Sequence, residues 1–309
     1  MRDQDVKTLK EFLSYDMKNA DEVLARFATL KGAEAYKGKL PKERFVFKPG
    51  TREDAITLVA HADTVFGEFS FIGGVNPGYY DQYGLGDYFR QRGNQKQTIT
   101  LQNIDGQEII FGTNPNTGIG ADDRAGCAIA WLLANSGHNI LVLDGEEVGA
   151  VGAKFLMREH QQIRDAISKS RFVLEFDRQG GNDYKCYQIP VSDDFKGYIE
   201  AKTGFKDAGM TSFTDISVLC EKVCGANLSV GYYNEHTPNE FLNVNEWLNT
   251  LNLTRQLTSE RIPQFNLDAG KAEKFRQMRI ADEARMSEYM KQFRGGGKFF
   301  DKGIDPFSQ

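Results

Sequence analysis

The 309-residue sequence has few cysteines and no long apolar run. Four cysteines, Cys127, Cys186, Cys220 and Cys224, are too few for a disulfide framework in a chain of this length, and they lack zinc-knuckle spacing. No window approaches the roughly 18–20 apolar residues that span a bilayer. Residues 1–13 are charged and amphipathic, unlike a signal peptide. We therefore expect a cytoplasmic protein with reduced thiols and no membrane contact.

An excess of positive charge is also missing. The 38 Lys and Arg residues are outnumbered by 43 Asp and Glu residues, so the formal net charge is −5 and offers no footprint for nucleic acid. The glycine-containing stretch "TGIGADDRAG" (117–126) lacks the dinucleotide-binding spacing. Asp122 and Asp123 would also repel a phosphate at that helix start. Nucleic acids and nucleotides are therefore not expected partners.

Strand-like and helix-like patterns alternate along most of the chain. Strands are expected at 44–48, 55–60, 139–144, 171–177 and 227–233. Helices are expected twice within 5–31 and at 121–137, 149–160, 193–203, 214–224 and 244–259. An Asp-Gly turn predicts a hairpin of 97–102 with 107–112. This order predicts an α/β fold with a mixed, mostly parallel twisted sheet flanked by helices.

The composition changes after Pro263. A charged helix is expected over 268–293, followed by a glycine-rich tail. A chain of this length is near the upper size of one hydrophobic core. We therefore predict one catalytic domain at 1–262 and a C-terminal part at 263–309. The C-terminal helix either packs on the domain or forms a contact in a homo-oligomer.

Acidic and histidine residues follow the predicted strands, where ligand sites of α/β sheets lie. In chain order they are His61, Asp63, Asp122, Glu146, Glu147, Asp177 and His236, with Asp122 opening a helix rather than ending a strand. The chain has only four histidines in total. The other two, His138 and His160, are expected to be exposed.

These residue types suit a site for two metal ions. Zinc binds imidazole and carboxylate, and two ions need about three ligands each with one carboxylate shared. The predicted ligands are His61, Asp122, Glu147, Asp177 and His236. Three carboxylates and a hydroxide balance two divalent ions, which limits the cost of burial. Cobalt or manganese would also suit this ligand set.

Two further carboxylates have predicted roles beside these ligands. Asp63 lies two residues after His61 and can orient its imidazole. Glu146 is adjacent to a ligand and is placed to act as general base on a water held at the metals.

Five stretches, "HAD", "GADDRAG", "DGEEVGAVGAKFL", "FD" and "EHTPNE", resemble the di-zinc exopeptidases in the same order. The resemblance is greatest to peptidase T and the tripeptidase-like aminopeptidases, and it spans residues 40–250. It implies a three-layer sandwich in which the five predicted ligands hold two zinc ions. It implies that Asp122 bridges the ions, that Glu146 is the general base and that Asp63 supports His61. It also suggests Glu240 as a support for His236.

The chain departs from that family in one respect. Peptidase T-like enzymes insert a lid or dimerisation domain between the last aspartate and the last histidine. Only 58 residues separate Asp177 from His236 here, so we expect no such domain. The aromatic-rich segment 66–94 either forms a wall of the pocket or is a surface loop packed by its own aromatic rings.

The predicted function is metal-dependent hydrolysis of a peptide or amide bond by an aminopeptidase-like enzyme. One alternative is a deacylase of N-acyl amino acids on the same core; another is a non-catalytic scaffold on a peptidase fold. An aminopeptidase pocket should offer an unpaired carboxylate to the substrate's amino group, whereas an acylase pocket should offer an arginine. The available arginines are Arg90, Arg92, Arg124 and Arg178.

Three positions keep a second interpretation. Asp183 is an alternative to Asp177 as a ligand. Residues 214–215 resemble a threonine-aspartate turn that contacts substrate, but they also suit a helix N-cap. Residues 232–233 are two tyrosines that could donate to an oxyanion or pack in the core.

Overall fold

The computed structural model describes residues 1–66 and 97–277. The chain forms two compact units, Met1–Leu267 and Asp268–Gln309. In the second unit residues 269–277 are helical. The rest of the predicted C-terminal helix and tail lies outside the described residues, as do positions 67–94 of the aromatic-rich segment.

The main sheet of the first unit has eight strands, and its centre is parallel. In spatial order the strands are β1 (Glu34–Lys37), β2 (Arg44–Lys48), β6 (Asn139–Leu143), β3 (Thr57–His61), β7 (Val173–Arg178), β10 (Gly225–Ser229), β8 (Asp183–Lys185) and β9 (Lys206–Asp207). Strands β6, β3, β7 and β10 run parallel, whereas β1, β2 and β8 pair antiparallel. The mixed, mostly parallel sheet predicted from the sequence is therefore confirmed.

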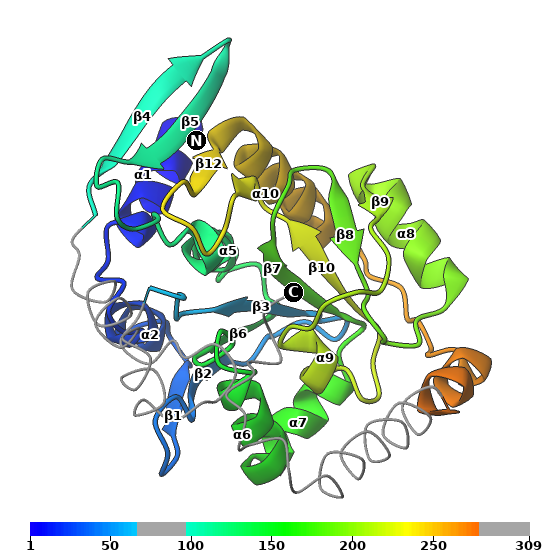
Figure 1. Ribbon diagram of the computed structural model, residues 1–309. Coiled ribbons are helices and arrows are strands. Elements are labelled where there is room, and N and C mark those ends of the chain that lie inside the picture. The colour runs from blue at the N-terminus through cyan, green and yellow to red at the C-terminus, as the bar shows by residue number, and fades with distance from the viewer. Residues whose placement is uncertain (67–96, 278–309) are drawn as a thin grey trace, which may run out of the picture. The chain divides into compact units, whose positions relative to one another are not determined.

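Helices cover both faces of this sheet (Figure 1). They are α1 (Arg2–Leu13), α2 (Asp21–Ala28), α5 (Ala121–Leu132), α6 (Val151–Glu159), α7 (Gln161–Ser168), α8 (Asp193–Thr203), α9 (Ile216–Leu219) and α10 (Val244–Ser259). Helix α5 packs on β3 and β7, and α1 packs against α5. Helices α6, α7 and α9 lie on the opposite face. Because both faces are covered, β3 and β6 are buried along their whole length, which explains their continuous apolar sequences.

The predicted hairpin belongs to a second, antiparallel sheet. Its strands β4 (Ile99–Ile104) and β5 (Gln107–Gly112) pair with β12 (Phe241–Asn243), which pairs with β11 (Tyr232–Tyr233). The Asp105-Gly106 turn has positive φ at both residues, as a two-residue hairpin requires. The predicted hairpin is therefore confirmed, and the antiparallel pairs of the main sheet come from β1, β2 and β8 instead. Ile110 of β5 pairs with Leu242 of β12, and both are fully buried there.

The prediction that His138 is exposed is also wrong. Its imidazole is fully buried, accepts the backbone N–H of Ile56 at Nδ1 and donates from Nε2 to the carbonyl of Thr258. Burial lowers the pKa of His138. The neutral ring therefore links Ile56, just before β3, to Thr258 in α10. His160 is partly buried and packs edge-on against the ring of Phe155.

Two predicted helices are shorter than expected. The helix predicted at 121–137 ends at Leu132, and only Ile216–Leu219 is helical within 214–224. All four cysteines are buried, and none forms a disulfide. No helix in the two described stretches combines the length and the apolar composition that crossing a membrane requires.

Helix α5 can approach the sheet closely because Gly126 has no side chain. A Cβ at this position would lie less than 3.0 Å from the carbonyl oxygen of Phe176 in β7 and from the carboxylate of Asp123. Neither atom is the end of a long flexible side chain, so the helix itself would have to move.

We expect Gly126→Ala to lower the free energy of unfolding by about 1–3 kcal/mol through overpacking between α5 and β7. Gly197→Ala in α8 is the matched control, because nothing lies within 4 Å of its added Cβ. The control should stabilise the protein by roughly 0.5–1 kcal/mol, the difference between alanine and glycine in a helix. Urea unfolding of both variants tests this, and equal stability of the two would contradict the close approach.

Candidate metal centre and active site

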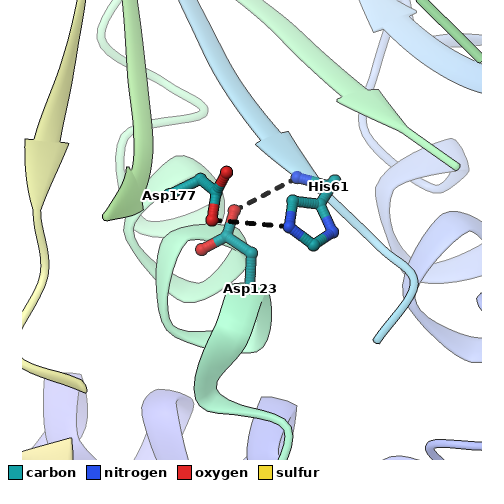
Figure 2. A group of neighbouring side chains, drawn as sticks. All are labelled: His61, Asp123 and Asp177. Carbon is teal, nitrogen blue, oxygen red and sulfur yellow. Dashed lines mark hydrogen bonds and ion pairs between the residues drawn. The ribbon is translucent and has the colours of Figure 1, made fainter. Parts of the chain in front are cut away.

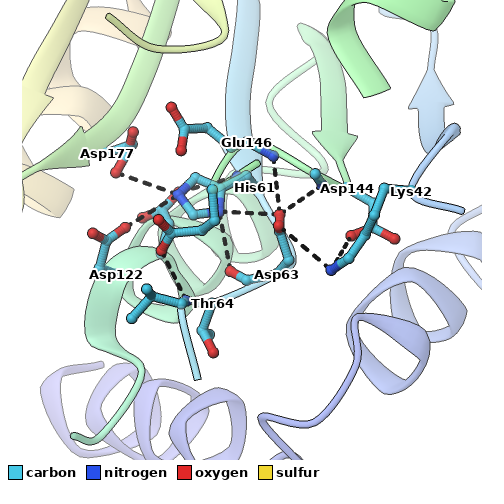
Figure 3. A network of polar contacts seen from close by, with 12 residues as sticks. Lys42, His61, Asp63, Thr64, Asp122, Asp144, Glu146 and Asp177 are labelled. Carbon is cyan, nitrogen blue, oxygen red and sulfur yellow. Dashed lines mark hydrogen bonds and ion pairs between the residues drawn. The ribbon is translucent and has the colours of Figure 1, made fainter. Parts of the chain in front are cut away.

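Three carboxylates and two imidazoles converge near the carboxyl ends of the central strands. Figure 3 shows His61, Asp122 and Asp177 among them. His61 is the last residue of β3, and Asp177 lies at the end of β7. Glu147 follows β6, Asp122 lies in the first turn of α5 and His236 follows β11. These are the five predicted metal ligands, and the fold brings them together from five separate segments.

Asp122 lies between the two histidines. Its Oδ1 is 3.1 Å from Nε2 of His61, and its Oδ2 is 3.0 Å from Nε2 of His236. Nε2 of His61 is also 3.5 Å from Oδ1 of Asp177, and Nε2 of His236 is 3.2 Å from Oε2 of Glu147. The site therefore consists of two groups that share Asp122. Each group also has one histidine and one carboxylate that belong to it alone.

These spacings fit two zinc ions. Ligand atoms about 2.0–2.1 Å from a tetrahedral zinc are roughly 3.3–3.4 Å from one another. In both groups the histidine Nε2 lies 3.0–3.5 Å from the two carboxylate oxygens. A shared carboxylate with one oxygen toward each group is the arrangement expected of a bridging ligand. The donor types and distances thus fit the predicted metals, while metal binding itself stays a prediction.

Asp123 adjoins this site, but its oxygens are already engaged (Figure 2). Its Oδ2 accepts the backbone N–H of His61 at 3.1 Å, and its Oδ1 accepts that of Gly126 at 2.9 Å. The peptide bond between Asp122 and Asp123 is cis. Asp123 thus caps α5 and ties it to β3, which leaves Asp122 as the better candidate ligand.

Hydrogen bonds hold Asp177 in place. The Tyr232 hydroxyl donates to its Oδ1 at 3.0 Å, and the Thr214 hydroxyl donates to its Oδ2 at 2.9 Å. Asp183, the alternative ligand, instead forms an ion pair with Arg178 at 2.8 Å. Tyr232 and Thr214 are therefore supports for a candidate ligand, a role that the sequence did not suggest for either.

Glu240 binds the backbone of the loop that carries Asp122, while its predicted support of His236 stays a prediction. Its carboxylate accepts the backbone N–H groups of Ile119, Gly120 and Asp122, at 2.7–3.1 Å. Burial raises the pKa of Glu240 to about 8, although these bonds oppose the shift. Glu240 thus fixes the loop that carries Asp122.

Asp63 connects the first histidine to the loop with the two glutamates. Nδ1 of His61 lies 3.0 Å from the carbonyl oxygen of Asp63 and 3.5 Å from its Oδ1. The same Oδ1 accepts the backbone N–H groups of Gly145 and Glu146 at 2.8 and 3.2 Å. With Nδ1 directed to Asp63, Nε2 of His61 faces the candidate ligands.

The Glu146 side chain extends from this loop past the His61 ring toward Asp177 (Figure 3). Burial and the neighbouring charges of Asp177 and Asp215 raise the pKa of Glu146 well above its ordinary value. Glu147 is held on the other side, because its Oε1 accepts the backbone N–H of Val65 at 3.0 Å. The adjacent glutamates thus point to different partners, as their different predicted roles require.

Two more buried carboxylates lie close to this site. Neither oxygen of Asp215 has a hydrogen-bond partner, and Oε2 of Glu175 has none. Burial raises the pKa of Asp215 to about 8 and that of Glu175 well above its ordinary value, and the charge of Asp177 adds to both shifts. Glu175 is a single acidic residue inside the apolar run "FVLEF". This isolated charge is the local feature from which its presence near the site could have been predicted.

No protein-family model and no curated protein matches the sequence. Solved structures do match. Aminopeptidase PepT from Bacillus cereus has a TM-score of 0.55 at 15% identity, over 84% of this chain and 98% of that one. A tripeptidase from Staphylococcus aureus has a TM-score of 0.55 at 12% identity, over 84% and 98%. The Pyrococcus horikoshii TET1 peptidase has a TM-score of 0.53 at 15% identity, over 83% and 99%.

Identities of this size establish a shared fold and nothing finer. The fold is nonetheless the one implied by the sequence resemblance. The chain therefore has the α/β fold of the PepT-like and TET aminopeptidases.

Proposed function

We propose that the chain is a metal-dependent hydrolase of the aminopeptidase kind, which cleaves a small peptide or amide. The observation that carries the proposal is Asp122, whose two oxygens face two separate histidine–carboxylate groups at 3.0–3.1 Å. The shared fold and the position of Glu146 beside these groups add support.

The ligands in this proposal form two sets. His61, Asp122 and Asp177 would hold one zinc ion, and Asp122, Glu147 and His236 the other. Bound zinc supplies an acidified water and a Lewis acid that polarises the substrate carbonyl. Glu146 would take a proton from the attacking water and deliver it to the leaving amine. Asp63 would keep Nε2 of His61 directed at the site.

The buried carboxylates favour aminopeptidase over acylase activity. Three ligand carboxylates and a hydroxide already balance two divalent ions, so Asp215 adds surplus negative charge. A buried carboxylate without partners is costly, and a substrate ammonium would offset that cost. Among the described arginines, Arg178 is paired with Asp183, and buried Arg124 donates to backbone carbonyls of Asp16 and Asn19. Arg178 is thereby engaged, whereas Nε and Nη1 of buried Arg124 have no hydrogen-bond partner among the described residues.

The predicted homo-oligomer is a weaker part of the proposal. The TET1 peptidase is described as assembling into a tetrahedron or an octahedral shell. The fold shared with it is compatible with assembly by this chain through its C-terminal helix, of which residues 269–277 are described.

Glu146→Gln is expected to lower kcat on aminoacyl p-nitroanilides or tripeptides about 10²–10⁴-fold, because the amide cannot accept the proton. Zinc bound per chain, measured by elemental analysis, should stay at the wild-type value. The exposed Glu221→Gln is the control and should keep full activity. A fully metal-loaded Glu146→Gln enzyme with near wild-type kcat would overturn the mechanism.

Asp215→Asn is expected to reduce discrimination between a substrate with a free amino group and its N-acetylated form. The ratio of their kcat/KM values should fall about 10-fold, because one charge-assisted contact to the ammonium is weakened. Asp194→Asn, on an exposed helix turn, is the control. If the wild-type enzyme prefers the acetylated substrate, the acylase alternative replaces the aminopeptidase.

The metal-free protein should lose stability as pH rises. Hydrogen bonds to Asp122 and Glu147 raise the pKa of His236 to about 11, and burial raises the pKa of Glu147 to about 7. Both pKa values exceed those of the unfolded chain, so the folded state binds more protons and stability falls with pH. Between pH of about 6 and about 8.5, Tm should drop by at least about 3 °C.

Zinc replaces these protons, so the increase in Tm on adding zinc should be larger at the higher pH. Thermal unfolding with zinc or with chelator at both pH values measures this. A zinc effect that is absent at both pH values would remove the metal site and favour the scaffold alternative.

A further inference from the structure

Lys42 is a buried lysine that faces two buried aspartates (Figure 3). Only 7% of its surface is exposed. Its Nζ lies 3.1 Å from Oδ1 of Asp144 and 3.5 Å from Oδ2 of Asp63. Although burial opposes it, the charges of these two aspartates raise the pKa of Lys42, so the ammonium is retained. A lysine is rarely buried in this way unless it is paired.

Within the described parts of the chain, Lys42 is the only cation paired with the two aspartate oxygens that face it. Neither Oδ2 of Asp63 nor Oδ1 of Asp144 has a hydrogen-bond partner. The other oxygen of Asp63 is engaged by the backbone of Gly145 and Glu146, and the other oxygen of Asp144 accepts from Nε of Arg44 at 2.8 Å. Lys42 is therefore the cation that pairs with Oδ2 of Asp63, the oxygen that does not bind the loop.

The surrounding turn holds Lys42 in this position. The N–H of Gly38 donates to the carbonyl of Glu43, and the Glu43 carboxylate accepts from the N–H of Leu40 and from Arg158. Lys42 also packs on the catalytic loop: a Cβ added to Gly145, which has φ of +82°, would lie 2.8 Å from Cβ of Lys42. The lysine is thus fixed against the loop that carries Glu146 and Glu147.

We propose that Lys42 is a positioning residue that acts through Asp63. Its ammonium, 3.5 Å from Oδ2, holds the Asp63 carboxylate in place, so that Oδ1 stays bonded to the N–H groups of Gly145 and Glu146 and lies 3.5 Å from Nδ1 of His61. The inference rests on the proposed function, because its object is the geometry of the zinc ligands and of Glu146. Without Lys42, Oδ2 of Asp63 would be a buried carboxylate oxygen that has lost its ammonium partner, which is unfavourable.

The test compares Lys42→Met, Asp63→Asn and the double variant, each as the full chain. Zinc affinity, measured by competition with a chelator, should fall about 10–100-fold in Lys42→Met. Because both residues act through one carboxylate, the double variant should bind zinc no more weakly than Asp63→Asn alone. With saturating zinc, kcat of Lys42→Met should fall while KM stays near the wild-type value. Exposed Lys37→Met in β1 is the control.

A purely structural role makes a different prediction. It would lower the Tm of Lys42→Met without changing zinc affinity, or would add its effect fully to that of Asp63→Asn; either result overturns the inference. If Lys42→Met does not fold, the variant K42M/D144N replaces it. This variant removes one buried charge of each sign and still leaves Asp63 without its ammonium, so the same loss of zinc affinity is expected.

Zinc binding by the wild-type protein distinguishes failure of the proposed function from failure of this inference alone. If it binds no zinc, the proposed function fails together with this inference. If it binds zinc and Lys42→Met binds equally well, the inference alone fails.

Discussion

The concentration of negative charge among buried carboxylates is the constraint on which the rest of this structure depends. Asp122, Glu147 and Asp177 lie around two histidines, with Glu146 and Asp215 beside them. Like charges at such distances in a low-dielectric interior raise one another's pKa, and no fold tolerates them without cations. The backbone N–H of Val65 anchors Glu147, and the hydroxyl groups of Thr214 and Tyr232 anchor Asp177. Each of these two carboxylates has an oxygen 3.2–3.5 Å from Nε2 of a histidine. Divalent cations bound between these carboxylates would offset the repulsion among their charges.

The parallel sheet makes this concentration possible. The carboxyl ends of β3, β6 and β7 open at one edge, and each strand adds a short polar segment there after an apolar run. The strands themselves need only be buried, so the chemistry is confined to the residues just beyond them. Helix α5 completes the site because Gly126 lets it lie directly on the sheet, which places Asp122 between the histidines.

Much of this could be predicted from the sequence, for a physical reason. Buried strands such as "NILVL" are continuous apolar runs, and polar residues at their ends are conspicuous by contrast. The parallel core emerged from that contrast, and so did the nomination of the strand-end residues His61, Glu146, Glu147 and Asp177, whose roles stay predictions. Short edge strands such as β8 and β9 escaped prediction because a pairing of two or three residues depends on a partner distant in sequence. His138 was placed wrongly because its burial depends on Thr258, 120 residues away.

The supporting residues escaped prediction for the same reason. Lys42, in "KLPKERF", has the neighbours of an ordinary surface turn, and nothing local indicates that its ammonium meets Asp63 and Asp144. Its effect is set by long-range contacts that only the folded chain creates. The residues that touch a metal or a substrate are limited in type by their chemistry, so sequence can nominate them. The residues that hold those in place are limited only by geometry and charge, and they are found by asking which buried oxygen still lacks a partner.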